Sequence, residues 1–203
     1  MTSKVERIKL NSNITIFKSN YDWTYSREDL ILLTKHNIAT IGLSDITTSP
    51  LIIKSKELEH VYDYSRNLAF KILSKEVPKR WMEKHWVYAS NRFTTQDERE
   101  APLFHNHEYC VDTYNRQPIA TDLTYCFYLN VPNDLKGNEG KLEFKDKEGE
   151  VVSFLPSTGE ILFFNPIYLH KPNFIYKSKQ ERIVICSNLK VEYKGLNERR
   201  SLI

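Results

Sequence analysis

The feature that most constrains the fold is a series of short strand-like segments, separated by few residues, in the second half of the chain. These segments are rich in aromatic and β-branched residues and are bounded by polar or proline- and glycine-containing turns such as Pro156-Ser157-Thr158-Gly159. Parallel strands need long crossover connections, usually helical, and the spacing here leaves no room for them. We therefore expect an antiparallel sandwich or barrel. The predicted strands are 86–93, 124–131, 141–145, 151–155, 160–165 and 181–190.

The first half of the chain shows helical spacing instead. Ser26 and Asp29 resemble a capping box, which predicts a helix over residues 27–36. A longer amphipathic helix is predicted after Ser55, with Pro78 closing it. Its apolar residues recur every three or four positions: Leu58, Val61, Tyr62, Leu68, Ala69, Ile72 and Leu73. Helices followed by closely spaced strands predict an α+β fold in which the helices cover one face of the sheet.

Composition narrows the class of protein. The 203 residues match one domain. No apolar run approaches the roughly 20 residues of a membrane span, and the first ten residues are too polar for a signal peptide. Three cysteines at no ligand spacing indicate reduced thiols. The net charge of +3 is too small to indicate nucleic acid by itself. We expect a cytoplasmic protein without a membrane partner.

A histidine pair is the first candidate for chemistry. His105 and His107 lie two residues apart, and side chains at that spacing point to the same face of a strand. Two imidazoles on one face can hold a divalent transition metal such as iron, zinc, copper or nickel. The pair alone is weak evidence for a metal.

Further polar residues downstream extend this pattern. His170 follows a predicted strand, and Arg182 opens the last strand on the face of Val184 and Cys186. A buried arginine needs an anionic partner, and its planar fork suits a carboxylate. The alternative is a salt bridge at the rim, with Glu181 or Glu160.

The strand 124–131 has a core face and a polar face. Its odd positions are apolar or aromatic, whereas Thr124 and Tyr128 belong to the even, polar-capable positions. A hydroxyl from either residue is suited to completing a carboxylate site with Arg182. The alternative is an ordinary half-exposed strand.

The order of these motifs resembles the 2-oxoglutarate- and Fe(II)-dependent oxygenases. The sequence reads H-x-H, TYCFYLN, GKLEF, P-x-x-GEILFF, a lone histidine and an arginine on the final strand. It is most similar to the prolyl-4-hydroxylase-like branch and to small bacterial and phage homologues, over residues 86–190. The resemblance implies a double-stranded β-helix, or jelly roll, of two facing antiparallel sheets. Within a single domain of residues 1–203, residues 1–84 are the predicted helical support and residues 85–193 the core.

The resemblance also implies a set of site residues. It makes His105, His107 and His170 the ligands of Fe(II), and it makes Arg182 the partner of the distal carboxylate of 2-oxoglutarate. Tyr128 stands where the family often places a tyrosine that binds the same carboxylate, and Thr124 lines that pocket. The implied activity is hydroxylation of a C–H bond with O₂ and 2-oxoglutarate as co-substrates.

The second ligand departs from the family pattern. The family usually carries a carboxylate, as in H-x-D, where this chain has His107. Three neutral imidazoles offset none of the charge of iron. Glu108 and Asp112 are alternative carboxylate ligands if the strand bulges; on a regular strand, Glu108 is out of phase with His105.

The substrate and the rival functions follow from weaker signals. The resemblance favours a peptide or protein substrate, hydroxylated at a residue such as proline, over nucleic acid. Tyr109, Tyr114 and Arg116 lie in a long segment after the histidine pair and suit either a peptide or a stacked base. The alternatives are a nucleic-acid- or nucleotide-modifying oxygenase of the same fold, a non-catalytic jelly-roll binding or structural module, and a three-histidine metal enzyme that does not use 2-oxoglutarate.

Overall fold

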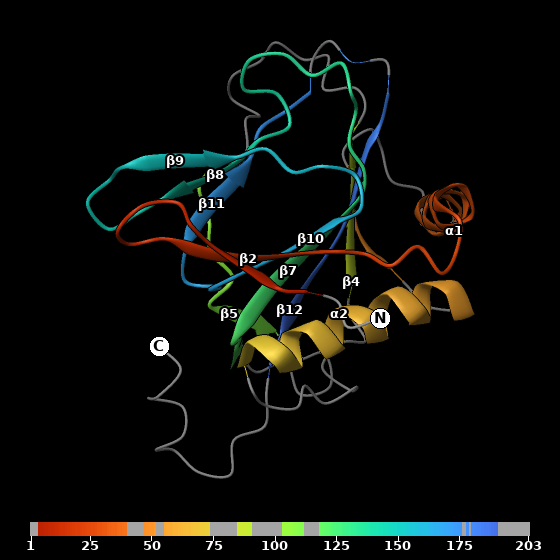
Figure 1. The fold of residues 1–203 in the computed structure, drawn as a ribbon, viewed down its shortest axis with the longest axis horizontal. Coiled ribbons are helices and arrows are strands. Elements are labelled where there is room, and N and C mark those ends of the chain that lie inside the picture. The colour runs from red at the N-terminus through yellow and green to blue at the C-terminus, as the bar shows by residue number, and fades with distance from the viewer. Residues whose placement is uncertain are drawn as a thin grey trace.

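Two facing antiparallel sheets form the centre of the molecule, which is a computed structural model (Figure 1). The structure describes residues 4–39, 47–51, 55–73, 85–90, 103–111, 118–175, 178 and 180–190. The major sheet has seven strands in the order β1-β2-β10-β7-β12-β4-β3, and its pairings are antiparallel. Its strands are β1 (Glu6–Lys9), β2 (Thr15–Asn20), β3 (Thr47–Leu51), β4 (His85–Ser90), β7 (Leu123–Asn130), β10 (Glu160–Phe164) and β12 (Arg182–Leu189).

The minor sheet has the order β11-β8-β9, again antiparallel. Its strands are β8 (Leu142–Lys145), β9 (Val151–Phe154) and β11 (Leu169–Pro172). An isolated bridge pairs His105 with His170, so the segment 103–107 runs beside β11. A separate two-stranded sheet pairs β5 (Tyr109–Val111) with β6 (Pro118–Ala120). The predicted α+β jelly roll is confirmed.

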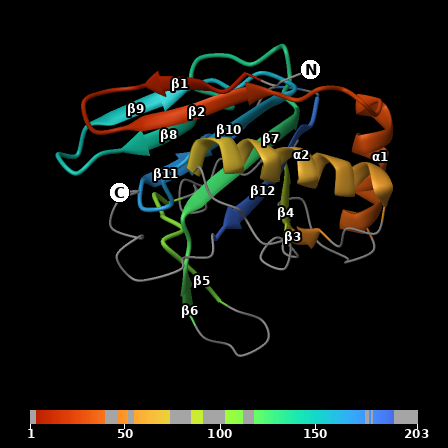
Figure 2. The ribbon, with the colours of Figure 1, turned by 60° about the horizontal axis from the view of Figure 1, so that its bottom comes forward.

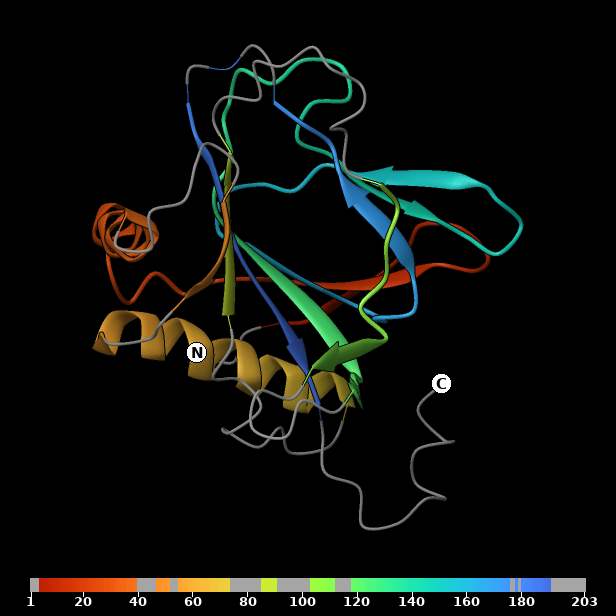
Figure 3. The same ribbon diagram turned by 180° about the vertical axis from the view of Figure 1, so that it is seen from behind.

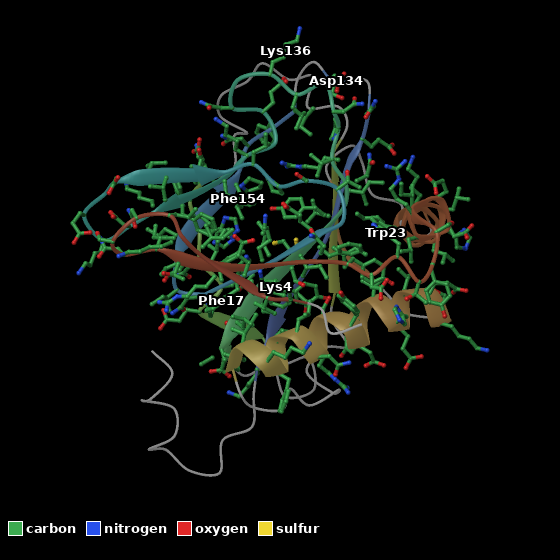
Figure 4. The ribbon with its side chains drawn as sticks, viewed as in Figure 1. Lys4, Phe17, Trp23, Asp134, Lys136 and Phe154 are labelled. Carbon is green, nitrogen blue, oxygen red and sulfur yellow. The ribbon has the colours of Figure 1, made fainter. Side chains whose placement is uncertain are left out.

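The alternation of side chains along β7 divides the interior into two apolar clusters. Tyr125, Phe127 and Leu129 point to the helices, whereas Cys126 and Tyr128 point to the minor sheet. The helix-side cluster consists of the buried residues Tyr21, Leu30, Leu58, Val61, Tyr62, Leu68, Ala69, Leu73, Leu123, Tyr125, Phe127, Leu129, Ile161, Phe163, Ile183, Ile185 and Leu189. The inner cluster, between the two sheets, consists of Ile14, Ile16, Cys126, Tyr128, Leu142, Phe144, Leu162, Phe164 and Val184. In Figure 4, Phe17 and Phe154 mark side chains that pack against the helix-side and inner clusters respectively.

The two helices cover the outer face of the major sheet, as the sequence predicts. Helix α1 spans Arg27–Ala39 and α2 spans Lys56–Leu73. At the start of α1, the Ser26 hydroxyl donates to the Asp29 carboxylate at 2.7 Å and accepts the Asp29 amide at 3.1 Å, which is the predicted capping arrangement. Figure 2 shows α2 crossing β7 and β12, and Figure 3 shows it on the side of the major sheet opposite the minor sheet. Neither described helix is long and apolar enough to cross a membrane. Pro78 lies outside the described residues.

The first part of the chain is less helical than its pattern predicts. Strands β1 and β2 form a hairpin, and β2 extends the major sheet by pairing with β10, with Ile16 opposite Phe164. Strand β3 forms the opposite edge beside β4. Short, polar strands such as ERIK carry little periodic signal, because three of the four residues are exposed and the strand is held in the sheet by its backbone pairing with β2. Residues 1–84 therefore supply strands to the sheet as well as helices.

The turn before β10 forms where the segment Pro156-Ser157-Thr158-Gly159 predicts it. Gly159 has a φ of +88°, a conformation that side-chain-bearing residues rarely adopt. A Cβ at this position would lie 3.1 Å from the ring of Trp23, which is labelled in Figure 4. The glycine thus permits both the turn and the approach of the indole.

Candidate metal centre

Three histidines from distant parts of the chain meet at one point. One ligand atom from each of His105, His107 and His170 lies within 4.8 Å of the other two. The ring centroids are separated by 5.0 Å for His105 and His107, 4.6 Å for His105 and His170, and 4.9 Å for His107 and His170. Three imidazoles at these separations suit a transition-metal ion held between them.

Backbone hydrogen bonds fix where the three histidines lie. The His105 amide donates to the His170 carbonyl at 3.0 Å, and the His170 amide donates back to the His105 carbonyl at 2.8 Å. The His107 amide donates to the Pro166 carbonyl at 2.8 Å. The Thr121 hydroxyl donates to the His107 carbonyl. His105 thus forms a single bridge with β11 rather than belonging to a full strand, yet His105 and His107 still direct their rings to the same place.

Two of the imidazoles have their tautomers set by backbone carbonyls. Nδ1 of His105 lies 3.0 Å from the Leu103 carbonyl, and Nδ1 of His170 lies 2.9 Å from the Tyr168 carbonyl. A carbonyl oxygen only accepts, so each Nδ1 carries the proton and each Nε2 keeps its lone pair for a ligand. Such outer hydrogen bonds orient histidine ligands in metal sites.

Burial keeps two of the histidines neutral. Desolvation, reinforced by the neighbouring His105, lowers the pKa of His107 to about 4. The pKa of His170 is lowered to about 3, chiefly by desolvation, against the opposing effect of its hydrogen bond to Tyr168. The His170 ring packs between Phe164, at a centroid distance of 4.8 Å, and Phe144, at 6.2 Å. At neutral pH both rings are therefore in the form that a metal requires.

The cluster found among the described residues contains no carboxylate. Glu108 follows His107, and its backbone carbonyl accepts the Thr121 amide at 2.9 Å, but its carboxylate is not a member of the cluster. Asp112, the other predicted alternative, lies outside the described residues. The donor set described here is three imidazoles, which fits Fe(II) and related ions by ligand type and brings no negative charge.

The predicted arginine lies on the inner face of the major sheet. Arg182 is only 1% exposed, and its Nη1 donates to the Asn173 carbonyl at 3.0 Å. Its guanidinium charge counteracts the rise in the pKa of Cys126 and of Tyr128. Both residues belong to the inner cluster, so Arg182 lies on the side of that cluster. Of the two carboxylates considered as rim partners, Glu160 pairs with Lys18 at 3.2 Å and Glu181 pairs with Lys35.

The two predicted hydroxyl residues also lie on the inner face of β7. Tyr128 is 4% exposed and stands opposite Val184, two residues along β12 from Arg182. Burial raises the pKa of Tyr128 well above its ordinary value, so its phenol remains a hydrogen-bond donor. Thr124 is buried as well, and its hydroxyl donates to Oδ1 of Asn188 at 2.8 Å.

Several residues that support this centre carry no distinctive sequence signal. Phe144 and Phe164 shield the ring of His170. Thr121 donates to the backbone carbonyl of His107, and the Tyr168 carbonyl bonds the ring of His170. Phe164 ends the EILFF run, whose apolar character predicts a core strand but not which side chain it will contact. Aromatic and backbone partners of this kind become visible only when the sheets are paired.

Comparison of the sequence with protein-family models finds no match, and comparison with curated proteins finds none either. Solved structures do match. HygX from Streptomyces hygroscopicus, solved with nickel and 2-oxoglutarate bound, is 9% identical with a TM-score of 0.58, covering 87% of this chain and 83% of its own.

Two prolyl hydroxylases match in the same way. The enzyme from Trichoplax adhaerens, in complex with a peptide fragment of the hypoxia inducible factor oxygen degradation domain, is 16% identical with a TM-score of 0.56 and covers 95% of this chain and 88% of its own. A Pseudomonas putida prolyl-4-hydroxylase is 12% identical with a TM-score of 0.50 and covers 87% and 93%. At these identities, what is shared is the fold.

Proposed function

We propose that this chain, which has the fold of the 2-oxoglutarate- and Fe(II)-dependent oxygenases, is itself such an oxygenase and hydroxylates a C–H bond of its substrate. One observation carries the proposal: three histidine ligand atoms converge within 4.8 Å, while the buried Arg182 lies on the inner face of the facing sheet. The histidine cluster can hold a metal ion, and the buried guanidinium can hold the carboxylate of a 2-oxo acid in the same sandwich.

In this proposal each of the predicted site residues has a binding or supporting role. His105, His107 and His170 hold Fe(II), with the Nε2 atoms of His105 and His170 left available by their carbonyl-bonded Nδ1 atoms. Arg182 and Tyr128 bind the distal carboxylate of 2-oxoglutarate, and Thr124 supports that wall through Asn188. When bound, the iron and the 2-oxo acid activate O₂ for attack on a substrate C–H bond. The apolar rings around His170 shield that ligand from water, whereas His105 is exposed, so the centre is open on the side of His105.

Charge balance makes 2-oxoglutarate a natural companion of this ligand set. Three neutral imidazoles leave both positive charges of Fe(II) uncompensated. The dianion of 2-oxoglutarate supplies two negative charges, one on the carboxylate next to the iron and one on the distal carboxylate that faces Arg182. The co-substrate thus supplies the negative charge next to the iron that a carboxylate ligand would otherwise contribute.

A peptide or protein is the substrate that the surroundings favour. Two apolar side chains in the segments that carry or hold the ligands are exposed: Leu103 by 83% and Ile167 by 46%. Exposed apolar groups beside a reaction centre suit the side chains of an extended peptide, proline among them. The shared fold with prolyl hydroxylases, one of them bound to a peptide, agrees with this assignment. The net charge of +3 provides no strong attraction for a nucleic acid.

One observation favours a second candidate, a non-catalytic module. The described cluster holds no carboxylate, so a protein that retained the scaffold and lost the chemistry would also fit this feature. The buried Arg182 and Tyr128 on the inner face weigh against the module, because a buried guanidinium is costly to maintain without a function.

Anaerobic addition of Fe(II) and then 2-oxoglutarate tests the proposal. We expect a visible charge-transfer band in the parent, its loss in His170→Ala, and its retention in the matched control His36→Ala, which alters an exposed histidine of α1. Metal binding without a band, and without succinate once air is admitted, would support a three-histidine enzyme that does not use 2-oxoglutarate. Absence of metal binding would support the non-catalytic module. Either outcome refutes the oxygenase.

The substrate class is tested separately, with the active protein. Peptide libraries with and without proline, and single-stranded oligonucleotides, are incubated with Fe(II), 2-oxoglutarate and air. We expect a mass increase of one oxygen atom in proline-containing peptides. Oxygen insertion only into the oligonucleotides would show a nucleic-acid-modifying oxygenase and overturn the peptide assignment while leaving the reaction type intact.

A further inference from the structure

Two cysteines face each other on the inner face of the major sheet. Cys126 on β7 and Cys186 on β12 are directly opposed in the antiparallel register, and their Sγ atoms lie 3.3 Å apart. Opposed residues of an antiparallel pair have Cα separations of about 4.5–5.5 Å, which falls within the range that a disulfide spans. Both are free thiols in this structure. Small rotations of the two side chains would bring the sulfurs into bonding distance.

The pair adjoins the residues assigned to the co-substrate. Cys126 lies two positions before Tyr128 on β7, and Cys186 lies four positions after Arg182 on β12, so the alternation of each strand puts them on the same face. Cys126 belongs to the inner cluster and is 7% exposed, whereas Cys186 packs against that cluster and is only half-buried. Neither sulfur is used in the proposed oxygenase chemistry.

We propose that Cys126 and Cys186 form a reversible redox modification site, at which hydrogen peroxide converts the two thiols into a disulfide that links β7 to β12. The half-buried Cys186 thiol reacts first, transferring two electrons to the peroxide to give a sulfenic acid and water. The Cys126 sulfur then attacks the Cys186 sulfur, the S–S bond forms, and the sulfenic hydroxyl leaves as a second water. Thiol reductants reverse the modification by exchange.

The environment of the thiols sets the conditions of this reaction. The contact with the Cys186 thiol, together with burial, holds the pKa of Cys126 well above its ordinary value. The thiolate is the reactive form, so Cys126 is held as the unreactive thiol, and the half-buried Cys186 is the sulfur that peroxide can reach first. Once formed, the bond ties together the two strands that carry Tyr128 and Arg182. The oxidation state of the pair thereby sets the rigidity of that wall, whether or not the chain uses 2-oxoglutarate.

Peroxide treatment of the metal-free 203-residue chain tests this inference. We expect the loss of two of the three thiols, recovery of a peptide linking Cys126 to Cys186 after alkylation and digestion, and complete restoration by a thiol reductant. The Cys110→Ser variant retains the linked peptide, whereas Cys126→Ser does not form it. Retention of all thiols at peroxide excess, or a linked peptide that contains Cys110, would overturn the proposal.

Thermal unfolding supplies a second readout that does not depend on activity. The bond joins residues separated by 60 positions, and closing a loop of that size restricts the unfolded chain. We expect the oxidised parent to unfold about 5 °C or more above the reduced parent, and the shift to vanish in Cys126→Ser. A lower unfolding temperature after clean formation of the linked peptide would show that the sheet is strained by the bond and is not built to accept it.

Discussion

Replacement of Arg182 by methionine is the sharpest test of the proposed co-substrate site. The guanidinium is 1% exposed, and its Nη1 is held by the Asn173 carbonyl on the inner face of β12. A guanidinium fork can donate two parallel charged hydrogen bonds to one carboxylate. Methionine preserves most of the side-chain length and apolar volume but removes every donor.

The expected magnitude follows from those two bonds. A hydrogen bond that involves a charged group contributes about 1.5–3 kcal/mol, so two contribute about 3–6 kcal/mol. At about 1.4 kcal/mol for each factor of ten, the Kd for 2-oxoglutarate should rise by about 10²- to 10⁴-fold. Arg182→Lys keeps the charge but loses the fork geometry, and should raise the Kd by about 10- to 100-fold.

The assay is anaerobic calorimetric titration of 2-oxoglutarate into the Fe(II)-loaded protein. Arg27→Met is the matched control, because Arg27 lies on the exposed start of α1, where it pairs with Glu28. Iron content and the temperature of unfolding are measured for each variant, so that a loss of fold is recognised. An Arg182→Met protein that is folded, holds iron and binds 2-oxoglutarate as tightly as the parent would refute the assignment of this residue.

Three further predictions concern the core, the turn and the charge of the centre. Phe127→Ala, in the helix-side cluster, should lower the free energy of unfolding in urea by about 3–5 kcal/mol, whereas Leu32→Ala, which is 66% exposed, should change it by under about 0.5 kcal/mol; equal effects would contradict the packing. The amide of Asn13 helps to hold the pKa of Asp146 below its ordinary value, so ionised Asp146 stabilises the fold, and the parent should lose this stability as the pH falls below about 4. Asp146→Asn should therefore show a shallower acid transition in circular dichroism. His107→Asp adds one negative charge, so its iron affinity should depend less on 2-oxoglutarate than that of the parent; an unchanged dependence in equilibrium metal titrations would contradict the charge argument.

Alternation within single strands is what the sequence specifies most fully. The division of β7 into a core face with Phe127 and a polar face with Tyr128 is readable from the residues alone, because side chains alternate with a period of two. The sidedness of Arg182 follows in the same way from its position relative to Val184. The helices are equally predictable, since capping residues and apolar spacing are local signals.

Pairing between strands is not a local signal, and there the sequence says less. Strand β2 joins β10 across more than a hundred residues, with Ile16 opposite Phe164, and its residues TIFKSN carry too weak an alternation to indicate a sheet edge. The same limitation explains why Phe144 and Phe164 around His170 could not be found in advance. Their role depends on which strands face one another.

The histidine cluster is partly predictable from local spacing and partly dependent on strand pairing. The H-x-H spacing by itself places His105 and His107 on a common side, but it does not say what they face. His170 meets them because its amide and carbonyl pair with those of His105, at 2.8 and 3.0 Å, across 65 positions of the chain. The two bonds that complete the backbone pairing at the edge of the minor sheet thus also set the distance between two of the candidate ligands. A centre built in this way is as rigid as the sheet that carries it, and such rigidity is what holding a metal in a defined geometry requires.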